Sequence, residues 1–417
     1  MNKVWLVALL TLSSAAWAAD KHMGVATCAS SVCHGSSSER SGGDIMHSEY
    51  VIWGQRDPHS GAYATLLNKQ SQRIAKNLGI GPAHEAKACL SCHSDYVAKE
   101  ERGARFQLSD GVGCESCHGG SERWLSSHTE RGVTHDDNLQ RGLTLLQDAG
   151  VRAEVCASCH VGDGEHIADH DIMGAGHPRL QFELATYSRF LPAHYRDDAA
   201  YQKRKHAPDS LELWAAGQLR SARNILQGLG SKRFMATPMW PELSFFDCHA
   251  CHAPMDAEKW QPRAVGTLPP GAVRLNDSAL LMVAWLLDAS DAAAAQQWRK
   301  GISNLHEASQ QDSAEVKQAS SKLLRQLDEL SAQLTESPHS VQPKLLFRRI
   351  SEDALNATFN DYMTAEQVLM VLALLAEKQQ LEPAMLDGLY ESMADQHHFR
   401  STEFLRALQE YQQSTPR

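Results

Sequence analysis

Ten cysteines constrain this chain of 417 residues more than any other feature, because they form five close pairs that all lie before residue 252. Four pairs have two residues between the cysteines and a histidine directly after the second. Two thiols at this spacing can add to the two vinyl groups of one porphyrin, and the histidine can then bind the iron from one face. The predicted haem-binding residues are Cys89, Cys92 and His93; Cys114, Cys117 and His118; Cys156, Cys159 and His160; and Cys248, Cys251 and His252.

Two other classes of cysteine site compete with this interpretation. Paired cysteines also occur in thiol redox motifs and in zinc sites, and ten cysteines in an oxidising compartment are most simply read as five disulfides. Neither class requires a histidine after the second cysteine of every pair. The repeated histidine therefore favours covalent c-type haem.

The first cysteine pair differs from the others. Cys28 and Cys33 are separated by four residues, and His34 follows directly. The alternative is a structural disulfide beside an incidental histidine. A haem on a longer linker uses all ten cysteines with none left over, so we predict five covalently attached c-type haems in total.

The chain has far more histidines than five haems need as motif ligands. Of its 21 histidines, sixteen lie outside these motifs, and twelve of those precede residue 250. A second histidine on the iron closes its sixth position, whereas an empty position lets a small molecule bind. The surplus predicts that most of the haems carry two histidine ligands and have low potentials.

Three segments resemble the cytochrome c-554/c-prime family of multihaem cytochromes. They are E-Y-V-I-W to D-P-H-S-G-A-Y (49–63), G-C-E-S-C-H-G with the following Trp124 and His128 (113–128), and H-D-I-M-G-A-G-H-P-R-L (170–180). The resemblance covers roughly residues 24–255 and implies a compact, mostly helical domain around closely packed haems that conducts electrons. The five-motif count and the long C-terminal extension depart from the four-haem member of the family.

The resemblance also implies which histidines bind the iron atoms from the second face. At matching positions these are His59, His128, His170 and His177. His194 is the candidate for the fifth, with His84 as its alternative. The sequence leaves open which of them pairs with which haem. The family includes proteins in which one haem lacks this second ligand.

The N-terminus predicts export. Lys3 precedes an apolar run over residues 4–12, and Ala16-Trp17-Ala18 forms a cleavage site. The run is too short to span a bilayer, and no later segment has transmembrane length. We therefore expect a periplasmic protein, cleaved near Ala18, with a formal charge of −11. This charge argues against nucleic acid or anionic membrane as partners and favours docking to basic patches of other redox proteins.

The fold is predicted to be mainly α, in two parts. Residues 1–18 are the signal peptide, 19–262 a haem-wrapped domain with short helices and long loops, 263–276 a linker, and 277–417 a helical bundle for docking or oligomerisation. Helices are expected over 60–78, 151–159, 180–190, 209–229, 277–290, 294–308, 313–335, 364–378 and 382–395. Thr364 and Gln367 read as a capping box. The histidines expected on the bundle surface are His306, His339, His397 and His398.

Three functions fit these features. The favoured one is electron transfer from a quinol-linked or cytochrome donor to a terminal acceptor. The second is an oxidoreductase acting on a small nitrogen or sulfur compound at one five-coordinate haem, for which the haem of Cys28 and Cys33 is the candidate. The third is a subunit of a larger cytochrome assembly. The histidine surplus makes a carrier a better interpretation than a catalyst.

Overall fold

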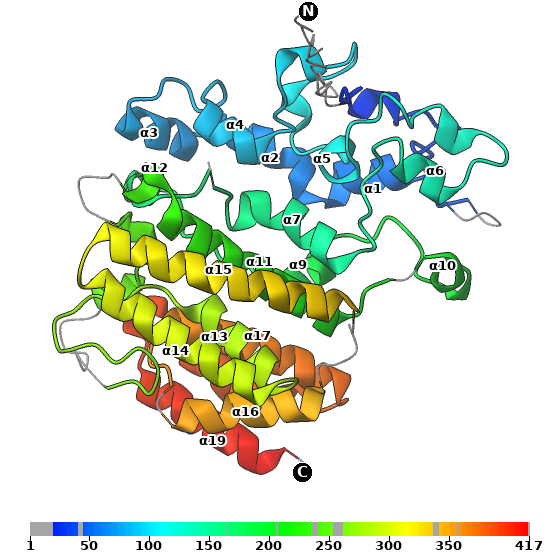
Figure 1. Cartoon of the computed structure of the whole chain (residues 1–417). Helices are drawn as coiled ribbons and strands as arrows, with labels where there is room; N and C mark the ends of the chain where they lie inside the picture. The colour runs from blue at the N-terminus through cyan, green and yellow to red at the C-terminus, as the bar shows by residue number, and fades with distance from the viewer. Residues whose placement is uncertain are drawn as a thin grey trace, which may run out of the picture.

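The computed structural model describes residues 20–40, 45–164, 166–205, 207–235, 241–252, 262–336, 342–356 and 358–415. The predicted signal peptide and His339 lie outside these residues. Every regular element within them is a helix, so the mainly α prediction is confirmed (Figure 1). Two isolated β-bridges, His22 to Arg102 and Phe246 to Leu275, add local contacts. None of the described helices is long and apolar enough to cross a membrane.

The first part of the chain consists of short helices joined by loops, in the upper part of Figure 1. These are η1 Val25–Thr27, α1 Glu49–Arg56, η2 Pro58–Gly61, α2 Ala62–Thr65, α3 Lys69–Leu78, α4 Lys87–His93, η3 Lys99–Glu101, η4 Leu108–Asp110, α5 Cys114–His118, η5 Ser127–Thr129 and α6 His135–Leu139. They surround a small apolar cluster of Leu66, Ala75, Ala83 and Leu90. So small a core holds together only with help from other contacts.

The helix expected over 60–78 is broken, which corrects the prediction. Helix α2 ends at Thr65, and α3 begins only at Lys69. The Asn68 side chain accepts a hydrogen bond from the backbone N–H of Ser71 at 2.8 Å and so caps α3. The apolar residues continue at helical spacing through the break, but the cap at Asn68 starts a new helix there.

The middle of the chain contains α7 Ala149–His160, α8 His170–Gly174, α9 Leu184–Phe190, α10 Ala199–Arg204, α11 Ser210–Gly230, α12 Lys232–Met235, η6 Leu243–Phe245 and η7 Cys248–Ala250. Helix α9 begins four residues later than expected because the Glu183 carboxylate caps it at the N–H groups of Ala185 and Thr186. Asp209 and Glu212 form a capping box at the start of α11.

The last part of the chain is a packed helical region, in the lower part of Figure 1. It contains α13 Ser278–Asp288, α14 Ala292–Ser309, α15 Ser313–Glu336, α16 Pro343–Leu355, α17 Tyr362–Lys378, η9 Pro383–Leu386, α18 Asp387–Ser392, η10 Gln396–His398 and α19 Ser401–Ser414. Helices α16 and α19 were not predicted, and the segment 382–395 divides into η9 and α18. Helix α13 is buried from Ser278 to Leu287, so it forms the centre of this region.

The start of α17 also differs from the prediction. The side chain of Asp361 accepts the N–H of Thr364 at 2.7 Å, so Asp361 is the cap and the helix begins at Tyr362. Thr364 lies inside the first turn, and its hydroxyl has no hydrogen-bond partner among the described residues. A carboxylate with an extended backbone is the stronger cap, which explains the displacement.

The haem-motif region and the C-terminal helices share one apolar core. Helix α11 packs against α7 on one side and against α13 and α15 on another (Figure 1). Trp214 of α11, Trp285 of α13 and Leu372 of α17 are fully buried in the same cluster. The C-terminal helices are therefore packed directly onto the helix that separates the fourth motif from the fifth.

One of the histidines expected on the bundle surface is instead buried. His306 of α14 has no exposed surface, and its Nε2 lies 2.9 Å from a carboxylate oxygen of Asp277. The apolar face of α14 includes this position, and the buried carboxylate supplies the partner that a buried imidazole requires. His397 and His398 are exposed, as expected.

Candidate functional site

Each two-residue-spaced motif lies on a helix or a helical turn. His93, His118 and His160 are the last residues of α4, α5 and α7, and Cys248 begins η7. On a helix, residues three apart share a face, so the two thiols of a motif point the same way. All ten cysteines lie in described residues, and none of them forms a disulfide.

Each of the five motif histidines faces one of the five histidines named as second ligands. The imidazole centres are 6.0–6.5 Å apart in every pair. The pairs are His34 with His128 (6.3 Å), His93 with His177 (6.4 Å), His118 with His194 (6.2 Å), His160 with His59 (6.0 Å) and His252 with His170 (6.5 Å). The sequence alone left this pairing open.

The spacing fits a metal ion held between two imidazoles. A metal–imidazole bond is about 2 Å long and the ring centre lies about 1 Å behind the ligating nitrogen, so two rings on opposite sides of one iron have centres about 6 Å apart. The donor set is therefore suitable for c-type haem.

Hydrogen bonds at Nδ1 orient several of these rings. Their partners are the Glu49 carboxylate for His34 (3.1 Å), the Asp57 carboxylate for His59 (2.8 Å), and the carbonyl oxygens of Ala62 for His93 (3.1 Å), Leu125 for His128 (2.5 Å) and Pro178 for His177 (2.8 Å). A ring that donates from Nδ1 offers Nε2 to a metal, and such partners fix its orientation. Sequence reasoning missed Glu49 and Asp57, although each is an acidic residue inside the segment that carried the family resemblance.

The electrostatics of the rings depend on these partners. The hydrogen bond to Glu49 raises the pKa of His34, and the hydrogen bond to Asp57 raises the pKa of His59. Burial, and to a lesser extent the neighbouring His194, lowers the pKa of His118 to about 4, which keeps that imidazole neutral. A neutral ring is the form that binds a metal.

Thiols from different motifs lie next to one another. Those of Cys28 and Cys114 are close enough to interact, which lowers the pKa of Cys28 and raises that of Cys114. The thiols of Cys92 and Cys159 interact in the same way, which lowers the pKa of Cys159 to about 7. The first motif is thus beside the third, and the second is beside the fourth.

A cavity of about 160 Å³ lies beside the fourth and fifth motifs and is lined by both His160 and Cys248. Arg179 and Ser244 are also in its wall. The Ser244 hydroxyl is buried and has no hydrogen-bond partner among the described residues. Arg179 is already paired with the Glu366 carboxylate in the same wall, so among these wall residues only the Ser244 hydroxyl is left without a partner.

The histidines left unassigned, or held as alternatives, have other partners. His84 lies edge-on to Tyr63, His47 is 2.6 Å from the carbonyl oxygen of Cys33, and His249 packs on Tyr362. These contacts give each of them a structural role next to a motif.

A group of His22, Asp95 and Glu115 has the composition of a metal site, but its atoms are already engaged. The Glu115 carboxylate accepts N–H groups of Met23, Gly24 and Ser121 at 2.7–2.8 Å. His22 Nδ1 lies 2.8 Å from Asp95. The group anchors the N-terminal segment.

Residues 27–119 match the family model described as "Cytochrome c554 and c-prime". The match contains the first three motifs and ends at Gly119, so it is shorter than the resemblance noted in the sequence. The comparisons with curated proteins and with solved structures gave no match. The chain thus carries, over residues 27–119, a domain of the cytochrome c554 and c-prime family, whose members transfer electrons by means of haem, and a further helical region follows it.

Proposed function

We propose that this protein transfers electrons in the periplasm through five covalently attached c-type haems, each held by two histidines. The observation that carries the proposal is the set of five histidine pairs with ring centres 6.0–6.5 Å apart. Each pair contains one motif histidine, including His34 of the longer first motif. Bound haem supplies a one-electron iron couple whose potential depends on its axial ligands and surroundings.

The neighbouring thiols support a continuous path between the attachment sites. The first motif adjoins the third, and the second adjoins the fourth. Cys117 of the third motif is within electrostatic reach of Cys156 and Cys159 of the fourth. The cavity shared by His160 and Cys248 joins the fourth motif to the fifth. The five attachment sites are thus connected: the fourth motif neighbours the second, third and fifth, and the third neighbours the first.

The second-ligand histidines also argue against a catalytic site at the first motif. An open iron was considered there because Cys28 and Cys33 are further apart than the cysteines of the other motifs. His128 lies across from His34 with the two rings nearly parallel, at 12°. A histidine in this position closes the iron to small molecules.

The partners in this proposal are other redox proteins, with a quinol-linked or cytochrome donor and a terminal acceptor. The formal charge of −10 for the whole chain favours partners with basic docking patches. The periplasmic location rests on the predicted signal peptide, residues 1–18, and on the extracytoplasmic location typical of the c-type cytochrome family. The C-terminal helices are available for assembly with a partner or a second copy.

A pyridine haemochrome count followed by electron paramagnetic resonance of the purified protein tests the proposal. We expect five haems per chain, all low-spin. A count of four, with Cys28 and Cys33 left as free thiols, would remove the longer motif from the haem sites. A high-spin haem that shifts with nitrite, hydroxylamine or nitric oxide would replace the carrier function with an enzymatic one.

A further inference from the structure

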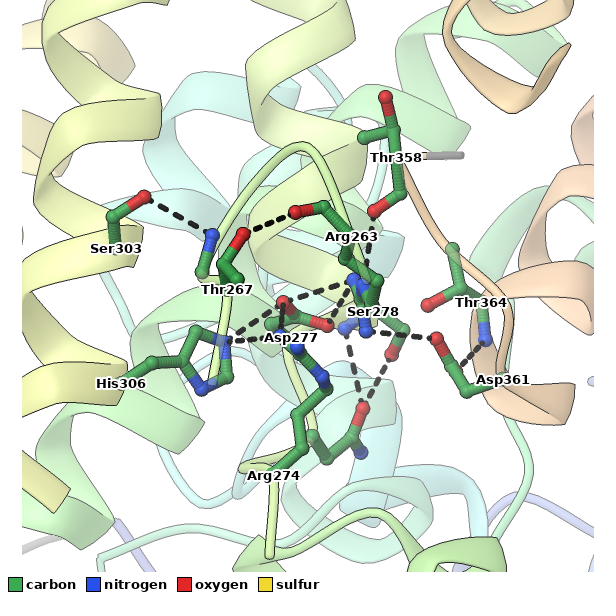
Figure 2. Close-up of polar contacts among 12 residues, drawn as sticks. Arg263, Thr267, Arg274, Asp277, Ser278, Ser303, His306, Thr358, Asp361 and Thr364 are labelled. Atoms are coloured by element: carbon green, nitrogen blue, oxygen red, sulfur yellow. Dashed lines mark hydrogen bonds and ion pairs between the residues drawn. The ribbon is translucent and has the colours of Figure 1, made fainter. Parts of the chain in front are cut away.

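A cluster of buried charges lies in the C-terminal region, where the segment before α13 meets α14 and α17. It consists of Arg263, Arg274, Asp277, His306 and Asp361 (Figure 2). Except for Arg274, whose side chain is 13% exposed, each member exposes less than a tenth of its surface. Buried charges are costly unless each has a partner, so the way in which they pair determines which of them can change its protonation.

Arg263 is the centre of the charge cluster. One of its terminal nitrogens lies 3.1 Å from both carboxylate oxygens of Asp277, and the other lies 3.2 Å from Asp361. Its Nε donates to the carbonyl oxygen of Thr358 at 2.9 Å. Both aspartates therefore contact the same arginine, which makes two contacts with Asp277 and one with Asp361.

Asp277 has further partners that Asp361 lacks. His306 Nε2 lies 2.9 Å from Asp277, and Arg274 lies 3.8 Å from the same oxygen. Although burial opposes ionisation, Arg263, His306 and Arg274 together hold the pKa of Asp277 well below its usual range. Burial raises the pKa of Asp361 to about 6 despite its contact with Arg263. Of the two, Asp361 is thus the carboxyl that gains or loses a proton near neutrality.

His306 does not compete for this proton. Its Nδ1 is buried and has no hydrogen-bond partner among the described residues. Burial lowers the pKa of His306, because a proton on Nδ1 would be a buried charge with nothing to accept its hydrogen bond. His306 is therefore neutral and donates from Nε2 to Asp277.

The charged and titratable groups around Asp361 come from several elements. Arg263 contacts Asp361 directly, and Asp277 and Asp247 act on it electrostatically. Arg274 and His306 on α14 contact Asp277. The other carboxylates on the neighbouring helices are already paired, Asp353 of α16 with Arg299 and Glu366 of α17 with Arg179. The nearby Asp247 and Asp277 both raise the pKa of Asp361.

The charge cluster lies directly behind the wall of the cavity that contains Cys248. Asn276 and Ser278, on either side of Asp277, line that cavity, and so does Met363, two residues after Asp361. The backbone N–H of Asp247 donates to the carbonyl oxygen of Arg274 at 2.9 Å. One layer of chain thus separates the charge cluster from the fifth attachment site.

Building on the proposed function, we propose that Asp361 binds a proton when the haem held by Cys248 and Cys251 is reduced. One electron arrives from a redox partner through the neighbouring haems, and one proton from solvent binds the Asp361 carboxylate. On oxidation both leave. Reduction removes one positive charge beside the charge cluster, so the carboxylate attracts a proton more strongly. The C-terminal region thereby makes electron transfer at this haem depend on proton uptake.

The experiment measures proton uptake and reduction potential together. The intact holoprotein is reduced electrochemically in weak buffer with a pH indicator, from below to above the Asp361 pKa of about 6. We expect the wild type to take up part of one proton per chain through this carboxyl and one haem potential to fall as pH rises. In the Asp361→Asn variant, the proton uptake through this carboxyl and the matching fall in haem potential should both be lost. Haem propionates titrate in both proteins, so the difference between them reports on Asp361.

Two further variants sharpen the test. Asp288→Asn is the matched control, because Asp288 pairs with Arg299 at the far end of α13 and away from Cys248. It should behave as wild type. In Asp277→Asn, Asp361 is the one of the two carboxylates that still pairs with Arg263, so the pKa of Asp361 falls. The pH range of proton uptake should therefore move to lower pH. An unchanged range in Asp277→Asn would contradict the proposal.

A measurement on the wild type covers the case in which Asp361→Asn does not fold. The infrared difference spectrum between reduced and oxidised protein should gain a carbonyl band of a protonated carboxyl that shifts in D₂O. Five haems per chain with no such band, or with equal proton uptake in Asp361→Asn, would overturn this inference and leave the proposed function intact. Four haems with free Cys248 and Cys251 would overturn both.

Discussion

Arg179 and Glu366 form a two-pronged ion pair, with nitrogen–oxygen distances of 2.9 and 3.2 Å. Arg179 follows the ligand candidate His177 by two residues, and Glu366 belongs to the first turns of α17. Both side chains line the cavity beside Cys248. The pair therefore connects the haem-motif region to the C-terminal helices at the point where the two parts share a cavity.

We predict that Glu366→Gln lowers the free energy of unfolding by about 2–3 kcal/mol, because it leaves the Arg179 guanidinium largely buried without a charged partner. Thermal unfolding followed by circular dichroism measures the change. The control is Glu377→Gln, which breaks the exposed pair of Arg189 and Glu377 between α9 and α17. It should change stability by less than about 0.5 kcal/mol. Equal losses in the two variants would contradict the role given to Arg179.

We predict that His194→Ala produces one high-spin haem per chain, because it removes the ring facing His118. Electron paramagnetic resonance of the oxidised protein measures the change. His84→Ala is the matched control, since His84 lies against Tyr63 instead. That variant should remain entirely low-spin. A high-spin haem in His84→Ala and none in His194→Ala would show that His84, and not His194, is the second ligand of this haem.

The pair of His22 and Asp95 predicts a pH-dependent contribution to stability. Burial alone would lower the pKa of His22, but the hydrogen bond and charge of Asp95, with Glu115 and Glu101, outweigh burial and raise it. The contribution is therefore fully present below the unfolded value of about 6.5 and is lost as pH rises through the higher folded pKa.

Unfolding free energies of wild type and Asp95→Asn, measured against pH, test this sign. The difference should be largest at the acidic end of a range kept above about pH 5, where carboxylates remain charged, and should shrink as pH rises. Asp395→Asn, which breaks the exposed pair of Asp395 and His398, should show little effect. A difference that grows with pH would contradict the assignment.

We predict that protein made without the haem-attachment machinery folds only in part. The cluster around Leu66 and Leu90 is small, whereas the core shared by α11 and the C-terminal helices is large. Limited proteolysis should degrade the chain before α7 and leave a resistant fragment that contains α11 and α13–α19. Resistance of the whole chain would show that haem is not needed to fold the first part.

The haem attachment sites were readable from the sequence because each is a short, continuous unit. Two thiols and a histidine within five residues are placed by local helical geometry, so no distant contact is needed to bring them together. The same holds for the long C-terminal helices, whose apolar pattern predicts α13, α14, α15 and α17 to within a few residues. Local caps moved their ends, as Asp361 does at α17.

The pairing of the histidines depended on tertiary structure. His59 faces His160 and His128 faces His34, across segments that are far apart in the chain. The carboxylates that orient two of these rings follow from the same packing. The burial of His306 beside Asp277 and the core that α11 shares with the C-terminal helices are also long-range contacts. A sequence pattern determines what one segment can bind. Packing determines which segments come into contact, and these contacts form only when the whole apolar core is assembled.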